Sequence, residues 1–147
     1  MKKLLILGGG TAGTMSANRL SSMLKDWQVT VIDRDDNHRY QPGYLFIPFG
    51  TYKPNQVTKS RREVLRKGVN VVYGEVDRVI PTENKVVLAD GSSHDYDYLI
   101  IATGVSPRPD QTDGLAEGIA LKDRVHEFYT YEGSVALARK LEKFEGG

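Results

Sequence analysis

Residues 8–13, with the sequence Gly8-Gly9-Gly10-Thr11-Ala12-Gly13, decide how this chain of 147 residues is interpreted. They follow directly on the apolar run 4–7, and the residues after them carry apolar side chains at helical spacing. A second apolar run ends at Asp33, twenty residues after Gly13. This order is the layout of a dinucleotide site, because a pyrophosphate must come close to backbone N–H groups at a helix N-terminus, where a side chain would hold it away.

Three glycines of this stretch have different expected tasks. Gly8 serves the tight turn, Gly10 allows the close approach of the pyrophosphate, and Gly13 allows the helix to pack against the strand. The alternative is an ordinary glycine-rich turn, which the surrounding strand, helix and acidic residue disfavour.

The composition is that of a soluble globular protein with one domain. Apolar residues make up 39% and charged residues 27% of the chain, and the formal net charge is +1. The basic residues between positions 59 and 67, Arg61 among them, are interrupted by Glu63 and are interpreted as the solvated face of a helix, so no nucleic-acid partner is expected. The 147 residues include no cysteine, so disulfides, a thiolate nucleophile and a cysteine-ligated metal are excluded from this sequence.

Two groups of polar residues are weighed as sites and set aside. The acidic residues Asp33, Asp35 and Asp36 suggest a metal, but carboxylates directly after a strand usually solvate a loop, so no metal is expected. His38 is a candidate proton donor, but a hydrogen-bonded loop histidine is the favoured interpretation. The catalytic residues therefore stay unknown.

The N-terminal residues do not have the pattern of a targeting segment. The apolar run after Lys3 is too short for a signal peptide and breaks into glycine. No stretch of the sequence approaches the length of a membrane span. We therefore expect a cytoplasmic location, or the cytoplasmic side of a membrane if another segment supplies the anchor.

The pattern of apolar residues predicts an α/β fold. Buried strands are expected over 3–7, 28–32, 69–73 and 98–102. Helices are expected over 11–24, 55–67 and 131–144, with Thr130 as the N-cap of the last one. Short strands over 74–80, 85–89 and 93–96 are expected to form a small antiparallel meander. The remaining long segments, 34–54 and 105–124, are expected to be loops.

The expected loop 34–54 is rich in aromatic rings. They belong to Tyr40, Tyr44, Phe46, Phe49 and Tyr52, and they follow no clean period, which suggests a surface that covers something. The rings could line the pocket of a ligand, or pack against another part of the protein. The second interpretation is favoured, and it predicts an exposed apolar patch that would allow self-association.

A second motif, Tyr96-Asp97-Tyr98-Leu99-Ile100-Ile101-Ala102-Thr103-Gly104, ends the last predicted strand of the sheet. Together with the glycine motif it resembles the FAD domain of the two-dinucleotide-domain flavoproteins, also called the pyridine nucleotide-disulfide oxidoreductase superfamily. The segments 38–45 and 128–133 resemble the sulfide:quinone oxidoreductase branch of that family.

The resemblance implies a Rossmann-like FAD-binding domain with a mostly parallel sheet. The strand order would be near 3-2-1 with the 98–102 strand beside the first, helices on one face and the meander on the other. Residues 1–147 would be a partial FAD-binding domain, the N-terminal part of a larger flavoprotein whose second dinucleotide domain and membrane-contacting C-terminal region follow.

The resemblance also implies which residues surround the cofactor. They are Gly8, Gly10, Thr11, Ala12, Gly13, Asp33, Arg34, Gln41, Pro42, Val76, Ala102, Thr103 and Gly104. The glycine motif would hold the pyrophosphate, Asp33 would accept hydrogen bonds from the adenosine ribose, and Arg34 would cover the adenine. Val76 would meet the adenine through its backbone. Gln41 with Pro42 would approach the ribityl chain or the isoalloxazine, and residues 102–104 would pass along the cofactor.

The activity that the resemblance implies is transfer of electrons from sulfide through FAD to a quinone, so that sulfide and quinone are the expected small-molecule partners. Family members use cysteines for sulfur chemistry, and Tyr129 stands where some of them have one, so this chain alone is expected to be inactive. One alternative is an NADH:quinone reductase of the same architecture. The other is a non-catalytic dinucleotide-binding module.

The sequence predicts that FAD binds more tightly than NADPH. The Ala102-Thr103-Gly104 motif and the meander belong with flavin domains in the family that the chain resembles, and the carboxylate of Asp33 disfavours a ribose 2′-phosphate. Isothermal titration calorimetry measures both affinities. Tighter binding of NADPH than of FAD or ADP-ribose would contradict the assignment.

Overall fold

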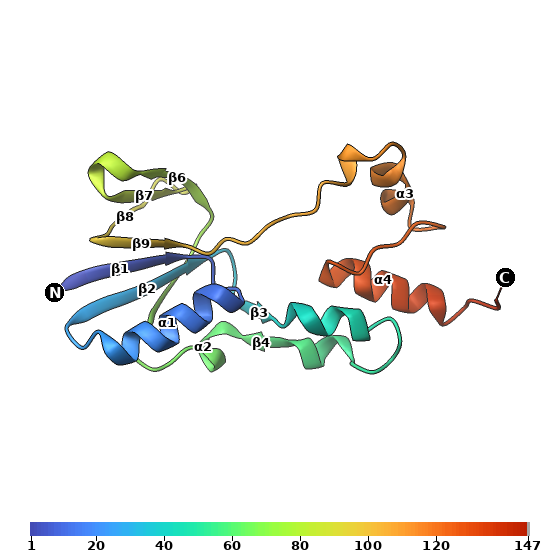
Figure 1. The fold of residues 1–147 in the computed structure, drawn as a ribbon, viewed down its shortest axis with the longest axis horizontal. Helices are drawn as coiled ribbons and strands as arrows, with labels where there is room; N and C mark the ends of the chain where they lie inside the picture. Colours follow the sequence, from blue (N-terminus) through green and yellow to red (C-terminus); the bar gives the residue numbers. More distant parts are fainter. Residues whose placement is uncertain (147) are drawn as a thin grey trace. The chain divides into compact units, whose positions relative to one another are not determined.

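The computed structural model describes residues 1–146, and the chain folds into two compact units (Figure 1). The first unit contains Met1–His38 and Lys59–Gly104. The second contains Arg39–Thr58 and the segment that begins at Val105. The glycine motif and Asp33 both belong to the first unit.

The first unit is built on a four-stranded parallel sheet in the order β5-β2-β1-β9. Its strands are β1 (Lys2–Leu7), β2 (Trp27–Asp33), β5 (Asn70–Tyr73) and β9 (Tyr98–Ile101). The central strands β1 and β2 bury apolar side chains on both faces of the sheet, as expected for a parallel sheet that is covered on both sides. The predicted strands, their order and the position of β9 beside β1 are confirmed.

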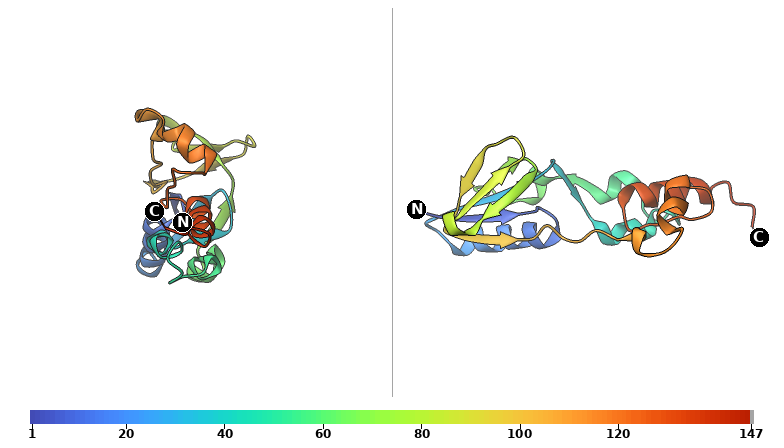
Figure 2. Two further views of the ribbon diagram at one scale, coloured as in Figure 1. Left: turned by 90° about the vertical axis from the view of Figure 1, so that its right-hand side faces the viewer. Right: turned by 90° about the horizontal axis from the view of Figure 1, so that it is seen from above.

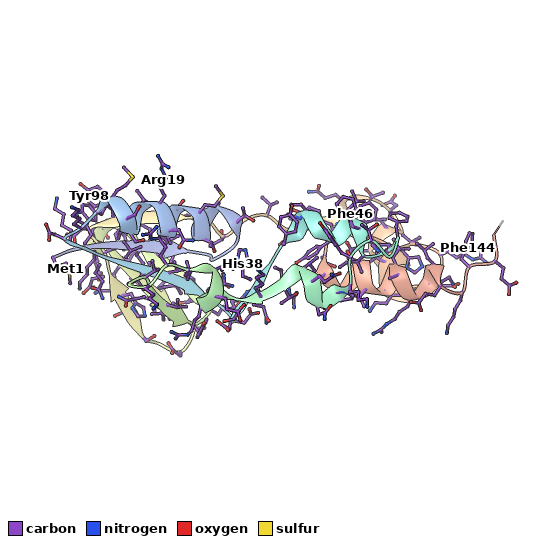
Figure 3. All side chains as sticks on the ribbon, turned by 90° about the horizontal axis from the view of Figure 1, so that it is seen from below. Met1, Arg19, His38, Phe46, Tyr98 and Phe144 are labelled. Atoms are coloured by element: carbon purple, nitrogen blue, oxygen red, sulfur yellow. The ribbon has the colours of Figure 1, made fainter. Side chains whose placement is uncertain are left out.

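The two faces of the sheet are covered by different layers, because successive side chains of a strand point to opposite faces. Leu4 and Ile6 of β1 pack with Ala17 of α1 (Thr11–Met23), whose Arg19 points away from the sheet in Figure 3. Leu5 and Leu7 pack on the opposite face. Their partners there include Val86 and Leu88 of the meander.

The meander consists of β6 (Val76–Ile80), β7 (Lys85–Leu88) and β8 (Ser93–Asp95), paired antiparallel. It turns at the short helix η3 (Pro81–Glu83), followed by Asn84 at φ +50°, and again at Gly91 with φ +85°. The right-hand view of Figure 2 shows the meander and α1 on opposite sides of the sheet. The predicted arrangement, with a helix on one face and the meander on the other, is therefore confirmed.

The predicted helix over 55–67 is wrong. The segment forms η2 (Pro54–Val57), β4 (Thr58–Ser60) and the single turn α2 (Arg61–Val64), and β4 pairs with β3 (Asn37–Arg39). The Ser60 side chain accepts a hydrogen bond from the backbone N–H of Arg62 and so begins the turn, while Leu65 returns to an extended conformation and ends it. Strand pairing and the burial of Arg61 override the helical propensity of this stretch.

The second unit has a small core of its own, in which Tyr44, Ile47 and Val57 are buried against Tyr131 and Val135. Its elements are η1 (Gln41–Phe46), η4 (Pro109–Gln111), α3 (Leu115–Leu121) and α4 (Tyr131–Leu141). The predicted last helix is confirmed, and the Thr130 hydroxyl caps it by accepting a hydrogen bond from the N–H of Gly133 at 3.0 Å.

The predictions of unbroken loops over 34–54 and 105–124 are wrong. The first segment contains β3 and η1, and the second contains α3. The short helix α3 begins after Gly114, at φ +73°, and ends at Lys122, at φ +52°. It has no side-chain N-cap and only seven residues, so the sequence lacks the signals by which a helix is usually predicted.

The aromatic rings of the second unit differ in burial. Tyr44 is 6% exposed, whereas Phe49 is 68%, Tyr40 52% and Phe46 41% exposed. Of these four rings from the predicted loop, Tyr44 belongs to the core of the unit, and Tyr40, Phe46 and Phe49 leave large apolar side chains at its surface, as the sequence predicts.

We predict that Ile6→Ala lowers the free energy of unfolding by about 2 to 5 kcal/mol, the usual cost of truncating a buried isoleucine. Ile6 is fully buried at the centre of the sheet. The matched control is Ile101→Ala, in the same sheet but with its side chain 65% exposed, which should cost below about 1 kcal/mol. Urea unfolding followed by circular dichroism measures both. Equal costs would show that the sheet is not the core of this unit.

Candidate functional site

The candidate site lies where β1 ends and α1 begins, at the carboxyl end of the parallel sheet. Ligands of open α/β sheets bind outside this edge, because the loops that follow the strands gather there. The glycine motif, Asp33 and the Ala102-Thr103-Gly104 motif stand at the ends of three adjacent strands of the sheet, β1, β2 and β9. The fold therefore brings these three predicted parts of the site to one edge.

Gly8 and Gly13 are needed for the packing of the protein itself. Gly8 has φ +90°, and a Cβ atom there would collide with the backbone carbonyl of Ala102. A Cβ atom on Gly13 would collide with the carbonyl oxygen of Gly8. These contacts fit the predicted tasks of the two residues, the tight turn and the packing of helix on strand.

Gly10 differs from both, because its surroundings are open. Among residues 1–146, a Cβ atom built on Gly10 meets no atom within 4 Å apart from its neighbours in the chain, and the backbone angles of Gly10, φ −66° and ψ −166°, are accessible to any residue. Neither packing nor backbone conformation demands a glycine here. A ligand that approaches the backbone closely would demand one.

The N-terminus of α1 is open as well. Gly10 is the N-cap and offers no side chain, no acidic residue stands in the first turn, and Gly10, Thr11 and Ala12 are exposed. The first backbone N–H groups of a helix lack partners inside the helix, and the helix dipole adds partial positive charge to them. This terminus is therefore suited to bind an anion.

Asp33 stands beside this terminus at the end of β2. Its Oδ2 atom accepts a hydrogen bond from the Gly9 N–H, and its Oδ1 atom accepts one from the Arg34 N–H at 2.7 Å. The side chain is 21% exposed. Asp33 is thus fixed in direction and still accessible to a hydroxyl donor.

Three side chains lie within hydrogen-bond distance of one acceptor in the glycine motif, the carbonyl oxygen of Gly9. Arg61 donates to it through Nη1, and Thr14 through Oγ1 at 2.9 Å. The Nδ1 atom of His38, which Figure 3 labels, lies 3.2 Å from the same oxygen. His38 therefore lies at hydrogen-bond distance from the glycine motif, although it belongs to β3 and not to a loop as predicted.

Arg61 and Thr14 are the supporting residues that sequence reasoning missed. Arg61 is 2% exposed, so its interpretation as part of a solvated helix face is wrong. No local signal separates it from Arg62, because its partner Gly9 lies 52 positions away in the chain. Thr14 is one of few polar residues on the packed face of α1, which is a weak signal.

The Ala102-Thr103-Gly104 motif lies directly beside the glycine motif. The Ala102 N–H donates to the Leu7 carbonyl at 2.8 Å, and its carbonyl faces Gly8. Gly104 has φ +76°, a conformation that favours glycine.

The other predicted site residues occupy three places. Arg34 follows Asp33 and is exposed, and Val76 is the first residue of β6, both in the first unit. Gln41 and Pro42 begin η1 in the second unit. Their assignment to the cofactor stays a prediction.

A polar cluster flanks Asp33 at the ends of β2 and β5, where Asp33 pairs with Tyr73. The Asp36 carboxylate accepts a hydrogen bond from Ser60 Oγ at 2.6 Å and another from the Tyr73 hydroxyl. The bond from Ser60 and then that from Tyr73 lower the pKa of Asp36 below its usual value. The same carboxylate raises the pKa of the Tyr73 phenol through their hydrogen bond.

Residues 1–146 contain no group of three or more His, Asp or Glu side chains placed to hold a metal ion. Over the same residues, each helix is too short or too polar to cross a membrane.

Comparison with known proteins identifies relatives among the oxidoreductases. The sequence matches the family described as "Pyridine nucleotide-disulphide oxidoreductase" over residues 2–143. It is 30% identical over 131 residues to the mitochondrial sulfide:quinone oxidoreductase of Dictyostelium discoideum, covering 88% of this chain and 29% of the relative. It is 25% identical over 161 residues to an alternative NAD(P)H-ubiquinone oxidoreductase of Arabidopsis thaliana, covering 97% of this chain and 30% of the relative.

Among solved structures, the fold matches the sulfide:quinone oxidoreductase of Aquifex aeolicus with a TM-score of 0.83 at 20% identity. The match covers 97% of this chain and 32% of that one. The predicted Rossmann-type fold and the resemblance to the sulfide:quinone oxidoreductase branch are confirmed. This chain spans 29% and 30% of the lengths of the two relatives above.

We predict that Tyr73→Phe raises the pKa of Asp36, because it removes one of the hydrogen bonds that lower it. A depressed carboxyl pKa contributes stability above the pKa of the unfolded chain, and this stability is lost as the pH falls through the folded value. The acid-induced loss of stability should therefore be smaller in Tyr73→Phe. Carboxyl ¹³C NMR titration measures the pKa, with Tyr98→Phe on the exposed edge of the sheet as the control. An unchanged pKa would contradict the contact.

Proposed function

Because this chain belongs to the pyridine nucleotide-disulphide oxidoreductase family, which it matches over residues 2–143, we propose that it supplies the FAD-binding part of a flavin-dependent oxidoreductase. The adenosine and pyrophosphate half of FAD would bind at the glycine motif, at the edge of the sheet where β1, β2 and β9 end.

A single observation carries this proposal: the exposed N-terminus of α1, with open space over Gly10 and no capping side chain. Gly8 and Gly13 are explained by packing, whereas Gly10 has no structural reason to be a glycine. A pyrophosphate on the N–H groups of this terminus would supply that reason, and it would compensate the helix dipole.

The residues around this terminus fit FAD. Asp33 presents an accessible carboxylate for the adenosine ribose, and an acid at this position disfavours a 2′-phosphate. Arg34 and the backbone of Val76 would border the adenine, Gln41 and Pro42 would approach the flavin end, and residues 102–104 would pass along the cofactor. When bound, FAD supplies the two-electron transfer, and the residues of this chain bind and orient it.

We propose sulfide as the electron donor and a quinone as the acceptor. The 30% identity to a protein named sulfide:quinone oxidoreductase supports this pairing. The chain has no cysteine, so a thiol that takes up sulfur would have to come from outside these 147 residues. A cytoplasmic location with peripheral contact to a membrane, where quinones reside, accords with this proposal.

A second candidate function is NADH:quinone reduction in the same architecture. Its support is the 25% identity to an alternative NAD(P)H-ubiquinone oxidoreductase. Both candidates use the same FAD site and differ in the donor. A third candidate, a dinucleotide-binding module without turnover, would bind FAD at the glycine motif but reduce no acceptor.

We predict that Gly10→Val abolishes FAD and ADP binding and leaves the chain folded. A valine side chain would occupy the open space that the pyrophosphate needs, yet within the part of the chain that the structure describes its Cβ atom meets no atom within 4 Å beyond its chain neighbours, and it requires no unusual backbone angle. Calorimetry measures binding, and urea unfolding measures stability. Gly13→Val is the contrasting control, because its side chain would collide with the Gly8 carbonyl and destabilise the fold.

The ribose contact is tested by Asp33→Ala, which should cost about 1 to 3 kcal/mol of binding free energy, the scale of a hydrogen bond to a charged group. Asp95→Ala, at an exposed acid of β8, is the matched control and should bind normally. Wild-type affinity in both Gly10→Val and Asp33→Ala would place the ligand elsewhere.

A further inference from the structure

Arg61 is a buried arginine whose guanidinium contacts the candidate site at Gly9 and Asp33 and also the segment that follows Asp33. Its guanidinium donates to three backbone carbonyls, those of Gly9, Asp35 and Asn37, the last two at 3.2 and 3.0 Å. Its Nη2 atom also lies 3.2 Å from Oδ2 of Asp33. With 2% of its surface exposed, Arg61 cannot itself touch a bound dinucleotide.

We propose that Arg61 is a positioning residue of the dinucleotide site. It would fix the orientations of the Gly9 peptide group and the Asp33 carboxylate without touching the ligand. This inference rests on the proposed function, because it assigns Arg61 a task only if a dinucleotide binds at the glycine motif. It concerns two separate contacts of the ligand, one with the pyrophosphate and one with the ribose.

The first contact depends on the direction of one peptide group. The carbonyl of Gly9 and the N–H of Gly10 belong to the same planar trans peptide, so they point in opposite directions. Arg61 and Thr14 hold that carbonyl toward the interior. The N–H of Gly10 is thereby turned outward, to the side where the pyrophosphate would bind.

The second contact depends on which oxygen of Asp33 is free. An ionised carboxylate has about two acceptor positions on each oxygen. Oδ2 accepts from the Gly9 N–H and lies beside Arg61, whereas Oδ1 has a single donor among residues 1–146, the Arg34 N–H. Oδ1 therefore keeps an acceptor position for a ribose hydroxyl, and Arg61 fixes the carboxylate in the orientation that presents it.

The planar fork of arginine is essential to this role. It reaches the Gly9 carbonyl with Nη1 and Asp33 with Nη2 at once, which the single ammonium of lysine cannot reproduce. Lysine would preserve the buried positive charge opposite Asp33, so Arg61→Lys separates charge from geometry. Arg61→Gln removes both.

The test measures the affinities of the full 147-residue chain for ADP and for 2′-deoxy-ADP by calorimetry. The wild-type chain should prefer ADP by about tenfold or more, because 2′-deoxy-ADP lacks the hydroxyl that donates to Asp33. Arg61→Lys should bind ADP about tenfold more weakly, since both contacts are misdirected. Its preference for ADP over 2′-deoxy-ADP should fall to below about threefold, because Asp33 is no longer held in one orientation.

The preference ratio is the decisive readout, because general loosening of the fold would weaken both nucleotides equally and leave the ratio unchanged. Arg66→Lys and Arg66→Gln, at an exposed arginine of the same segment, are the matched controls and should keep the wild-type affinities and ratio. Where Arg61→Gln unfolds, Arg61→Lys carries the test.

The outcomes separate this inference from the proposed function. Failure of the wild-type chain to bind ADP would overturn the dinucleotide site itself. Binding by the wild type, with an unchanged preference ratio in folded Arg61→Lys, would overturn the role of Arg61 and leave the dinucleotide site standing. Loss of the preference in Arg61→Lys, with the preference kept in the Arg66 variants, would support the role of Arg61.

Discussion

The close approach of backbone to backbone at the turn from β1 into α1 is the constraint on which the rest of the first unit depends. Gly8 lies against the carbonyl of Ala102, and Gly13 lies against the carbonyl of Gly8, with no room for a Cβ atom at either position. These contacts set α1 directly on the sheet and keep β9 beside β1. They leave the helix N-terminus at the edge of the sheet, where Gly10 is open.

The same turn is held from its other side by polar contacts. The Gly9 N–H donates to Asp33, and the Gly9 carbonyl accepts from Arg61 and Thr14, so both polar groups of this residue are satisfied by the protein. Because this peptide group is already fixed, little further conformational entropy is lost when a ligand binds beside it. The turn is therefore preorganised, and its free hydrogen-bonding capacity points to the open side of Gly10 and to Oδ1 of Asp33.

Much of this was predictable from the sequence, for identifiable reasons. The parallel strands are recognisable as short apolar runs, the glycine motif stands between the first of them and a helical stripe, and Thr130 caps α4 as its pattern predicts. The helix predicted over 55–67 failed because strand pairing and a buried arginine decide that segment, and their partners lie far away in the chain. The burial of Arg61 could not be predicted for the same reason. In the sequence a buried arginine cannot be distinguished from a solvated one, because its partners Gly9 and Asp33 become its neighbours only in the folded chain.

An NMR titration of the ¹⁵N-labelled chain with ADP shows directly whether the glycine motif and Asp33 form a dinucleotide site. A dinucleotide bound at this site should cause saturable shifts of the amide signals of Gly10, Thr11 and Ala12, and of Asp33 and Arg34, while the signals of the meander strand β8 stay in place. Saturable shifts centred on another surface, such as the basic segment 62–67, or the absence of any saturable shift, would contradict it.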